Sequence, residues 1–182
     1  MSSEASTQRL RLLAGIASDL LAAGRPQQVT GELCARIHAN LGLDAVLYYA
    51  FEDGGRTTLT LRSYAGLRPE VAAAVEHLDA RRGLCGLAAA RGTPAIVDTA
   101  HPATDPDDPL LEALGLPVVA CHPLIRPEGV VGTLLFGRRS HRPLDDEELC
   151  VMAAVASLAV LAIDARRQLR PSAVRSRRAN AA

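Results

Sequence analysis

The run Val118-Val119-Ala120-Cys121-His122-Pro123-Leu124-Ile125, followed after Pro127-Glu128-Gly129 by Val130-Val131-Gly132-Thr133-Leu134-Leu135-Phe136-Gly137-Arg138, predicts the two strands of a β-hairpin. Both strands are almost continuously apolar. They are the last two of the strands that the sequence predicts.

Two further strand signals precede this hairpin, and a third lies between them and the quoted run. Residues 45–51 are β-branched and aromatic, and residues 57–63 alternate polar with apolar side chains. The pair Gly54-Gly55 between them is a turn sequence, so these residues predict a second hairpin. Another strand is expected at residues 94–98. The sequence thus predicts five strands, four of them in two hairpins.

Helical periodicity occupies the segments around these strands. Five segments are predicted to be helical, either from apolar residues at three- or four-residue spacing or from a composition that favours helices. They are residues 5–23, 26–42, 68–79, 84–91 and 109–114. Gly42 is the expected stop of the second helix. Asp108, directly before Pro109, is the expected N-cap of the fifth.

The last helix has the clearest start. Asp145 can accept a hydrogen bond from the backbone of Glu148, and the Glu148 side chain can reach back. From Cys150 to Ile163 the helix is apolar on every side, so the face turned away from the sheet would meet water. Either the predicted helix over residues 5–23 or a second copy of the same surface can cover it. A self-complementary stripe favours a two-fold dimer, and we expect a homodimer through the terminal helices.

Length and charge limit the class of protein. The chain has 182 residues, of which 48% are hydrophobic and 22% charged, and this composition suits one folded domain, expected over residues 1–170. Residues 171–182 are rich in Pro, Ser, Arg and Ala and predict a disordered, Arg-rich tail. Six of the 20 arginines follow Asp164, so residues 1–165 carry 14 arginines against 20 acids, a balance of −6. An acidic body argues against nucleic acid binding, which needs clustered cations.

Neither a secretory signal nor a membrane span is expected. The N-terminus lacks a basic region followed by an apolar run. The longest apolar stretch, residues 150–163, is shorter than the roughly 20 residues that cross a bilayer as a helix. The four cysteines are far apart and form no CxxC pair, which predicts reduced and mostly buried thiols: Cys34, Cys85, Cys121 and Cys150. We expect a cytoplasmic protein.

The order of elements and several short motifs resemble the GAF domain, a bacterial small-molecule sensory domain of the type found in sensor kinases. The motifs are Leu-Arg-Ser-Tyr-Ala-Gly-Leu at 61–67, Gly-Leu-Cys-Gly at 83–86, residues 120–125 with 132–137, and the approach to the last helix at 142–149. The resemblance covers residues 8–168. It implies an α+β fold, in which a central antiparallel sheet has the terminal helices on one face and a loop-covered pocket on the other.

The resemblance also implies which residues border the ligand pocket: Tyr64, Cys85, Cys121, His122 and Thr133. Adjacent residues of a strand point to opposite faces, so alternation alone leaves open whether Cys121 or His122 faces the ligand. Residues 99–109 are rich in Asp and Pro and are expected to form a solvated loop over the pocket. The four Asp and one His of residues 98–108 match no calcium-binding spacing, and no metal is predicted.

Two GAF subgroups suggest other chemistry for the cysteines. Bilin-binding photoreceptors attach a tetrapyrrole to a cysteine followed by histidine, as at Cys121-His122, but here Pro123 follows in a strand and only 3% of the residues are aromatic. Free methionine sulfoxide reductases have a cysteine at a position similar to Cys85. They also need a second, nucleophilic cysteine in a loop, and residues 99–109 contain none.

The sequence therefore predicts a non-enzymatic sensory domain that binds a small molecule and signals through its terminal helices. Only 14 residues follow Gln168, so an output partner, such as the kinase of a two-component system, is expected on another chain. Three alternatives stay open: a bilin- or haem-type tetrapyrrole sensor, a dimeric interaction module without a ligand, and an enzyme similar to the sulfoxide reductases. The sequence does not identify the ligand or a cofactor.

Overall fold

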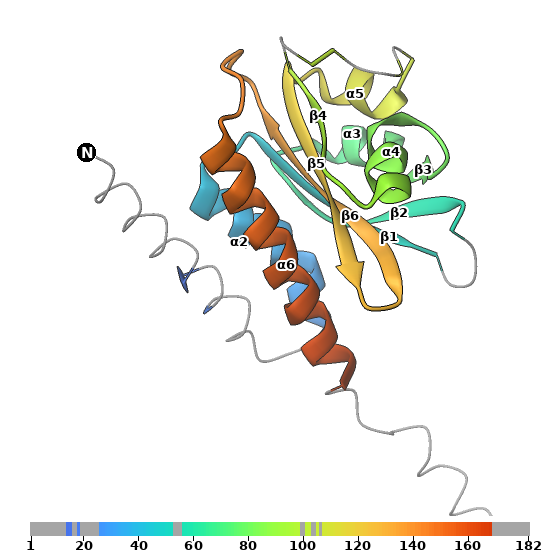
Figure 1. Cartoon of the computed structure of the whole chain (residues 1–182), viewed down its shortest axis with the longest axis vertical. Coiled ribbons are helices and arrows are strands. Elements are labelled where there is room, and N and C mark those ends of the chain that lie inside the picture. Colours follow the sequence, from blue (N-terminus) through green and yellow to red (C-terminus); the bar gives the residue numbers. More distant parts are fainter. Residues whose placement is uncertain are drawn as a thin grey trace, which may run out of the picture.

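The structure, a computed structural model, describes residues 26–52, 56–98, 101, 102, 105 and 107–168, together with residues 14, 15 and 18. Six strands form one antiparallel sheet in the order β3-β2-β1-β6-β5-β4 (Figure 1). Their bounds are β1 Ala45–Phe51, β2 Thr58–Ala65, β3 His77–Asp79, β4 Ala95–Val97, β5 Val118–Arg126 and β6 Gly129–Arg138. Since β6 pairs with β1 and β5 pairs with β4, both strands of the predicted hairpin lie inside the sheet and neither is an edge strand.

Helices cover both faces of the sheet, as Figure 1 shows. The described helices are α2 Pro26–Leu41, α3 Pro69–Ala74, α4 Gly83–Arg91, α5 Pro109–Leu114 and α6 Asp146–Gln168. The longer α2 and α6 lie side by side on one face, and the shorter α3, α4 and α5 lie on the other. This arrangement confirms the predicted α+β fold. In the described ranges, no helix combines the length and the apolar character that a membrane crossing requires.

The layer between the sheet and α2 and α6 is a continuous apolar core. Alternate residues of β5 and β6 face it, and α6 contributes a row of side chains that includes Met152, Val155, Ala156, Ala159 and Val160. On α2, the Cys34 thiol donates to the carbonyl oxygen of Ser63 on β2 at 3.2 Å. Burial raises the pKa of Cys34 to about 12, so this thiol packs as a small apolar group.

Both ends of α6 are attached to the β5–β6 hairpin. At the start, the predicted capping box is confirmed: the Glu148 backbone donates to Asp145 Oδ1 at 2.8 Å, and the Asp145 backbone donates to Glu148 Oε2 at 3.1 Å. The Glu148 carboxylate also pairs with Arg138 of β6. Near the other end, Asp164 pairs with Arg126 of β5. A shift of the hairpin therefore acts on α6 at two points.

A second core lies between the sheet and α3, α4 and α5. Tyr49 of β1 is fully buried there, and its hydroxyl donates to the carbonyl oxygen of Val75 at 2.9 Å, directly after α3. The side chains that point the same way from the central strands include Leu47, Val119, Cys121 and Leu135. Because both faces carry a core, each position of these strands belongs to one layer or the other.

The sequence-based predictions of the strands, of α2, α4, α5 and α6, and of their order are confirmed. The helix predicted over residues 68–79 is wrong in its second half, since α3 ends at Ala74 and His77–Asp79 form the edge strand β3. The backbone N–H of Leu61 donates to the Glu76 carbonyl at 2.8 Å, so the chain pairs with β2 directly after α3. The helix predicted over residues 5–23, the turn at 54–55 and the tail at 171–182 lie outside the described residues, apart from 14, 15 and 18.

Gly66 stands at a close approach of two backbone segments. Its φ is +79°, and a Cβ atom at this position would lie 1.9 Å from the carbonyl oxygen of Asp44. Gly42 also has a positive φ, +60°, but a Cβ there would meet nothing within 4 Å. Comparing alanine substitutions at the two glycines therefore separates the cost of backbone strain from the cost of a collision with backbone atoms.

We expect Gly66→Ala to lower the free energy of unfolding by about 3 kcal/mol or more, because it adds a collision with backbone to the strain of a left-handed residue. Gly42→Ala is the matched control and should cost about 1 kcal/mol, from strain alone. Urea denaturation followed by circular dichroism measures both. Equal losses in the two variants would contradict the close approach at Gly66.

His122 on β5 is a buried polar residue in the layer under α6. It is 2% exposed, and its ring packs edge-to-face on Phe136 with the ring centroids 5.5 Å apart. Its Nε2 atom has no hydrogen-bond partner among the described residues. Burial lowers the pKa of His122 from 6.5 to about 4. The ring is therefore neutral in the folded protein at neutral pH.

This burial predicts an acid-dependent loss of stability. The folded-state pKa of His122 lies below the unfolded-state value, so its neutral form contributes stability above pH 6.5 that is lost as the pH falls toward 4. Between pH 7 and pH 4 we expect the wild type to lose about 3 kcal/mol more than His122→Leu, which fills similar space without titrating. Urea titrations at several pH values measure the difference. A parallel loss in both proteins would assign the acid sensitivity to other groups.

Candidate functional site

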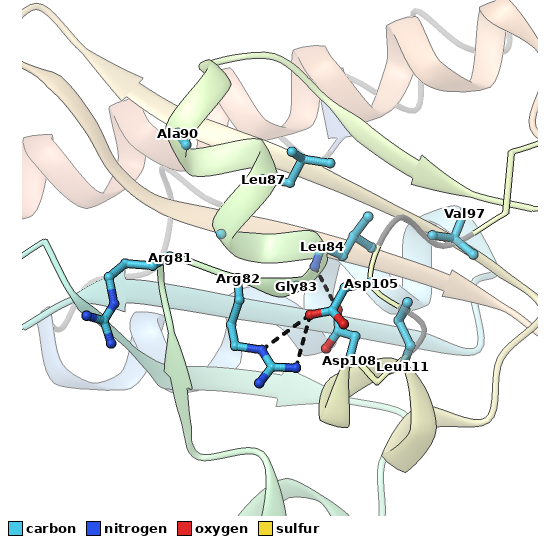
Figure 2. A pocket seen from close by; sticks show the side chains of 11 residues that line it. Arg81, Arg82, Gly83, Leu84, Leu87, Ala90, Val97, Asp105, Asp108 and Leu111 are labelled. Carbon is cyan, nitrogen blue, oxygen red and sulfur yellow. Dashed lines mark hydrogen bonds and ion pairs between the residues drawn. The ribbon is translucent and has the colours of Figure 1, made fainter.

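A cavity of about 220 Å³ lies between α4, β4 and α5, on the face of the sheet opposite α6 (Figure 2). Its apolar wall includes Leu84, Leu87, Val97 and Leu111. Its polar border consists of two arginines before α4 and two aspartates before α5: Arg81, Arg82, Asp105 and Asp108. Figure 2 shows Arg82, Asp105 and Asp108 gathered at one end, while Leu87 and Ala90 extend along α4 away from them.

A second cavity of about 260 Å³ adjoins the first. The two share four lining residues, which therefore lie between them: Arg82, Gly83, Leu84 and Asp108. The second cavity extends to β3 and to Cys85 of α4. A rearrangement of the shared residues would change both volumes together.

Asp108 caps two helices with one carboxylate. It is 4% exposed; its Oδ1 accepts from the Leu110 N–H at 2.9 Å, and its Oδ2 accepts from the Leu84 N–H at 2.6 Å. A carboxylate at a helix N-terminus satisfies an unpaired N–H and meets the positive end of the helix dipole. Gly83 permits the approach, because a Cβ there would lie 2.7 Å from Asp108 Oδ2. The predicted N-cap of α5 is confirmed, and it also holds the start of α4.

Arg82 connects the start of α4 to the segment before α5. Its Nε and Nη2 atoms lie 3.3 and 3.2 Å from Asp105 Oδ2, and Nη2 also donates to the Asp107 carbonyl at 3.3 Å. The Arg82 side chain is 54% exposed, so this pair is worth at most about 1 kcal/mol. Arg81 instead forms two shorter bonds with Asp79, at 2.9 and 2.8 Å. Of the two arginines, Arg82 is the one that a ligand can engage at low cost.

Cys85 of α4 and Cys121 of β5 lie against each other behind this wall. Their Sγ atoms are 3.5 Å apart, and both side chains are buried. Burial raises the pKa of the Cys121 thiol well above its usual range, and the adjacent Cys85 thiol adds to the increase. A thiol reacts as its thiolate, so Cys121 is held in its unreactive form.

The five residues predicted to border the pocket occupy different places. Cys85 and Cys121 meet on the pocket side, and Thr133 is buried on the same face of the sheet, its hydroxyl without a partner among the described residues. His122 lies on the opposite face, in the core under α6, so Cys121 is the member of the Cys-His pair that faces α4. Tyr64 is 38% exposed and borders neither of the two cavities.

The sequence analysis missed the residues that give the site its charge. The signal for Arg81 and Arg82 was two adjacent arginines directly before a glycine that starts a helix. Asp105 was assigned to a solvated loop. Only the fold brings Arg82 and Asp105 together, since they are 23 residues apart in the sequence.

The arrangement suits binding better than covalent chemistry. Among the described residues, no group of three or more His, Cys, Asp or Glu side chains could hold a metal ion. The cavity offers an apolar wall, a weakly held guanidinium and the half-buried carboxylate of Asp105. A small molecule with an apolar body and a polar group meets complementary surfaces there.

Comparison with known proteins agrees with this fold. The family model for the GAF domain matches residues 23–164. No curated protein matches the chain. The GAF domain from a phosphoenolpyruvate-protein phosphotransferase of Coxiella burnetii superposes with a TM-score of 0.74 and 22% identity, over 89% of this chain and 96% of that chain. A putative GAF sensor protein from Burkholderia vietnamiensis gives a TM-score of 0.70 and 19% identity, over 90% of this chain and 98% of that one.

Some of the similar folds belong to enzymes. The free methionine-R-sulfoxide reductase from Neisseria meningitidis, in complex with its substrate, gives a TM-score of 0.73 and 20% identity, over 93% of this chain and 95% of that chain. Likeness at this level of identity concerns the fold alone. The family model, in contrast, spans well over half of the sequence and includes every described strand. The chain therefore belongs to the GAF domain family.

Proposed function

We propose that this GAF domain is a non-enzymatic sensor that binds a small molecule in the cavity between α4, β4 and α5. The observation that supports this most directly is the Arg82–Asp105 pair at the border of an apolar cavity of about 220 Å³. Ligand sites typically combine an apolar wall with a few polar groups that fix orientation. A ligand that forms polar contacts with Arg82 or Asp105 would break their ion pair, and little free energy would be lost because the pair is weak.

The cavity volumes favour a small ligand. Drug-sized ligands fill pockets of roughly 300–1,000 Å³; the two adjoining cavities are about 220 and 260 Å³, so only a ligand that spans both would reach that range. A bilin or haem is far larger than either cavity. Cys121, the cysteine that would carry a tetrapyrrole by analogy with the bilin-binding photoreceptors, is 0% exposed. We therefore favour a small metabolite over a tetrapyrrole.

The central strands provide a route from the cavity to α6. Cys121 faces the pocket side, while its neighbour His122 packs in the layer under α6. A ligand that moved α4 against Cys121 would change the packing on the other side of the same strand. The ion pairs Arg138–Glu148 and Arg126–Asp164 would then transmit the shift to both ends of α6. Such a ligand must bind the two arrangements with different affinity.

In this proposal an output protein on another chain, such as the kinase of a two-component system, responds to the shift of α6. The sensor acts in the cytoplasm. The four cysteines are free thiols, which a reducing compartment preserves.

Filling the cavity tests the proposal. We expect anilinonaphthalene sulfonate, a fluorescent dye with an apolar body and one anionic group, to bind the wild type, and Val97→Phe to weaken this binding about 10-fold or more. The added ring would occupy the space between β4 and α4. Ile125→Phe is the control, since Ile125 is 52% exposed and lines neither cavity, and it should bind the dye like the wild type.

Fluorescence titration measures the affinity for the dye. Native mass spectrometry of the purified protein detects any ligand that stayed bound from the cell. Full dye binding by Val97→Phe would reject the cavity as the site. A wild type that neither binds the dye nor carries a ligand would favour the interaction module without a ligand.

A thiol-dependent reductase is the second candidate, because the Sγ atoms of Cys85 and Cys121 are 3.5 Å apart. Two thiols at this separation need little movement to form a disulfide. The reductase from Neisseria meningitidis has a similar fold. Against catalysis, both thiols are buried and the pKa of Cys121 is raised by burial. We therefore prefer the sensor.

Thiol reactivity distinguishes the two candidates. In the native protein we expect dithiobisnitrobenzoate to modify only Cys150 rapidly, since Cys150 is exposed and the other three cysteines are buried. All four should react after unfolding in urea, and Cys150→Ser should lose the fast phase. We also expect no reduction of free methionine sulfoxide in the presence of dithiothreitol. Turnover that disappears in Cys121→Ser would establish the reductase instead.

A further inference from the structure

The edge strand β3 borders two hollows in the surface of the domain (Figure 1). All of its residues, His77–Asp79, line the second cavity of about 260 Å³, which extends from β3 to α4 and α5. The same residues line an open groove of about 450 Å³, together with Thr57, Thr58 and Arg81. The other edge strand, β4, contributes only Val97 to these hollows and to the first cavity. Of the two edges, β3 is therefore the one with space beside it.

The backbone of β3 presents hydrogen-bonding groups to its free edge. Toward β2, the Glu76 carbonyl accepts from the Leu61 N–H, and the Ala80 N–H donates to the Thr57 carbonyl, both at 2.8 Å. Backbone groups alternate in direction along a strand, so the N–H and carbonyl groups of His77 and Asp79 point away from β2. The Asp79 carbonyl accepts from the Arg82 N–H at 3.3 Å, which leaves its second lone pair for a partner.

We propose that β3 is the docking site for an extended segment of a partner protein, which joins the sheet antiparallel to β3. The segment carries an apolar residue opposite Leu78 and a basic residue on each side of it. All strand pairs of the sheet are antiparallel, so this addition continues its pattern. Peptides that add to a sheet edge gain affinity from main-chain hydrogen bonds and specificity from pockets for alternate side chains. The site lies outside the first cavity and does not depend on ligand binding there.

The second cavity suits the apolar residue of the segment. Leu78 belongs to the core between the sheet and α3, α4 and α5, so a residue opposite Leu78 points to that side of the sheet. The cavity on this side has a largely apolar lining: Leu78, Leu84, Cys85, Pro109 and Leu110. An apolar side chain that entered it would be removed from water, which is the main source of affinity for such a group.

Charge favours basic residues beside the apolar one. Residues opposite His77 and Asp79 point to the other side of the sheet, where the groove lies. Three carboxylates lie at or next to this edge, Glu52, Glu76 and Asp79, whereas Arg81 supplies one guanidinium. Pairs of opposite charge on neighbouring strands stabilise a sheet, so basic side chains fit this surplus of acid.

The polar side chains of β3 leave the edge accessible. His77 Nδ1 lies 3.3 Å from the Thr60 hydroxyl on β2 and 3.8 Å from Glu52, so the ring is held over the neighbouring strand. Asp79 is paired with Arg81, whose side chain is 75% exposed. Charged side chains on an edge discourage unspecific pairing of strands. Because this ion pair is exposed, a basic side chain of the partner can replace Arg81 beside Asp79.

Short peptides test the pairing with the full chain. The probe is the pentapeptide Thr-Arg-Val-Arg-Thr, labelled with fluorescein at its N-terminus and amidated at its C-terminus, and fluorescence anisotropy measures its affinity. In antiparallel pairing, the peptide residues opposite His77 and Asp79 direct their N–H groups to β3, and the residue opposite Leu78 directs its N–H away. We expect N-methylation of either arginine to weaken binding about 10-fold or more, and N-methylation of the valine to change it less than about 2-fold.

The methylated peptides carry the same charge as the probe. A non-specific attraction to the acidic surface would therefore bind all of them alike, and this result would overturn the proposal. Loss of binding only on methylation of the valine would overturn the antiparallel pairing. We also expect the peptide with aspartate in place of valine to bind about 10-fold more weakly or worse, because it would bring a carboxylate into an apolar cavity. Equal affinity would reject the second cavity as the pocket for the apolar residue.

A proline on the edge tests the same contact from the side of the protein. His77→Pro removes an N–H that points away from β2 and keeps the groups that pair with β2. We expect the variant to bind the probe about 10-fold more weakly or worse, and to bind anilinonaphthalene sulfonate like the wild type, since His77 does not line the first cavity. Thermal unfolding followed by circular dichroism verifies its fold, and the peptide series decides if the fold is lost.

The two binding measurements separate this inference from the proposed sensor. A folded His77→Pro variant with wild-type affinity for the probe would overturn the pairing with β3. A wild type that binds the dye but shows no saturable binding of the probe at millimolar concentration would overturn the docking site and leave the sensor proposal intact. Probe binding without dye binding would support the docking site alone.

Discussion

The pairing of β6 with β1 on one side and β5 on the other is the contact on which the other elements depend. Gly132 allows it, because a Cβ there would lie 2.1 Å from the carbonyl oxygen of Tyr49. Once these strands are in register, each of their side chains belongs to one of two cores, and a slip of one residue would exchange the two sets. Cys121 and His122 are neighbours in sequence, yet one contacts α4 and the other lies under α6.

A more local constraint gives the cavity its shape. The Asp108 carboxylate holds the first turns of α4 and α5 together, and separating them would leave buried N–H groups unpaired. The two apolar walls are therefore held together at the start of their helices, while the Arg82–Asp105 pair at the border is partly exposed and weakly held. Walls joined at one end beside an exchangeable ion pair suit the recognition of a small molecule. Catalysis by the adjacent thiols would require a thiolate that burial disfavours.

Much of this fold could be predicted from the sequence because its signals are local. The central hairpin has two apolar runs and a turn, and α6 has a capping box. The prediction failed after Ala74, since an apolar residue such as Leu78 fits a helix stripe as well as a strand that pairs with β2. Of the five residues predicted to border the pocket, Cys85 lines a cavity. The Arg82–Asp105 pair could not be predicted, because no local pattern links residues that only the packing of α4 against α5 brings together.

The composition of α6 differs from that expected of a helix that only covers a sheet. A helix that only covered a sheet would carry charged residues on its outer face, where they stay hydrated and improve solubility. Residues 149–163 contain none, and the ion pairs that attach α6 to the hairpin lie at Glu148 and Asp164, just outside this stretch. The ion pairs thus act near the two ends of the helix, with no charged residue between them. A ligand-driven shift of β5 and β6 would move α6 through those pairs.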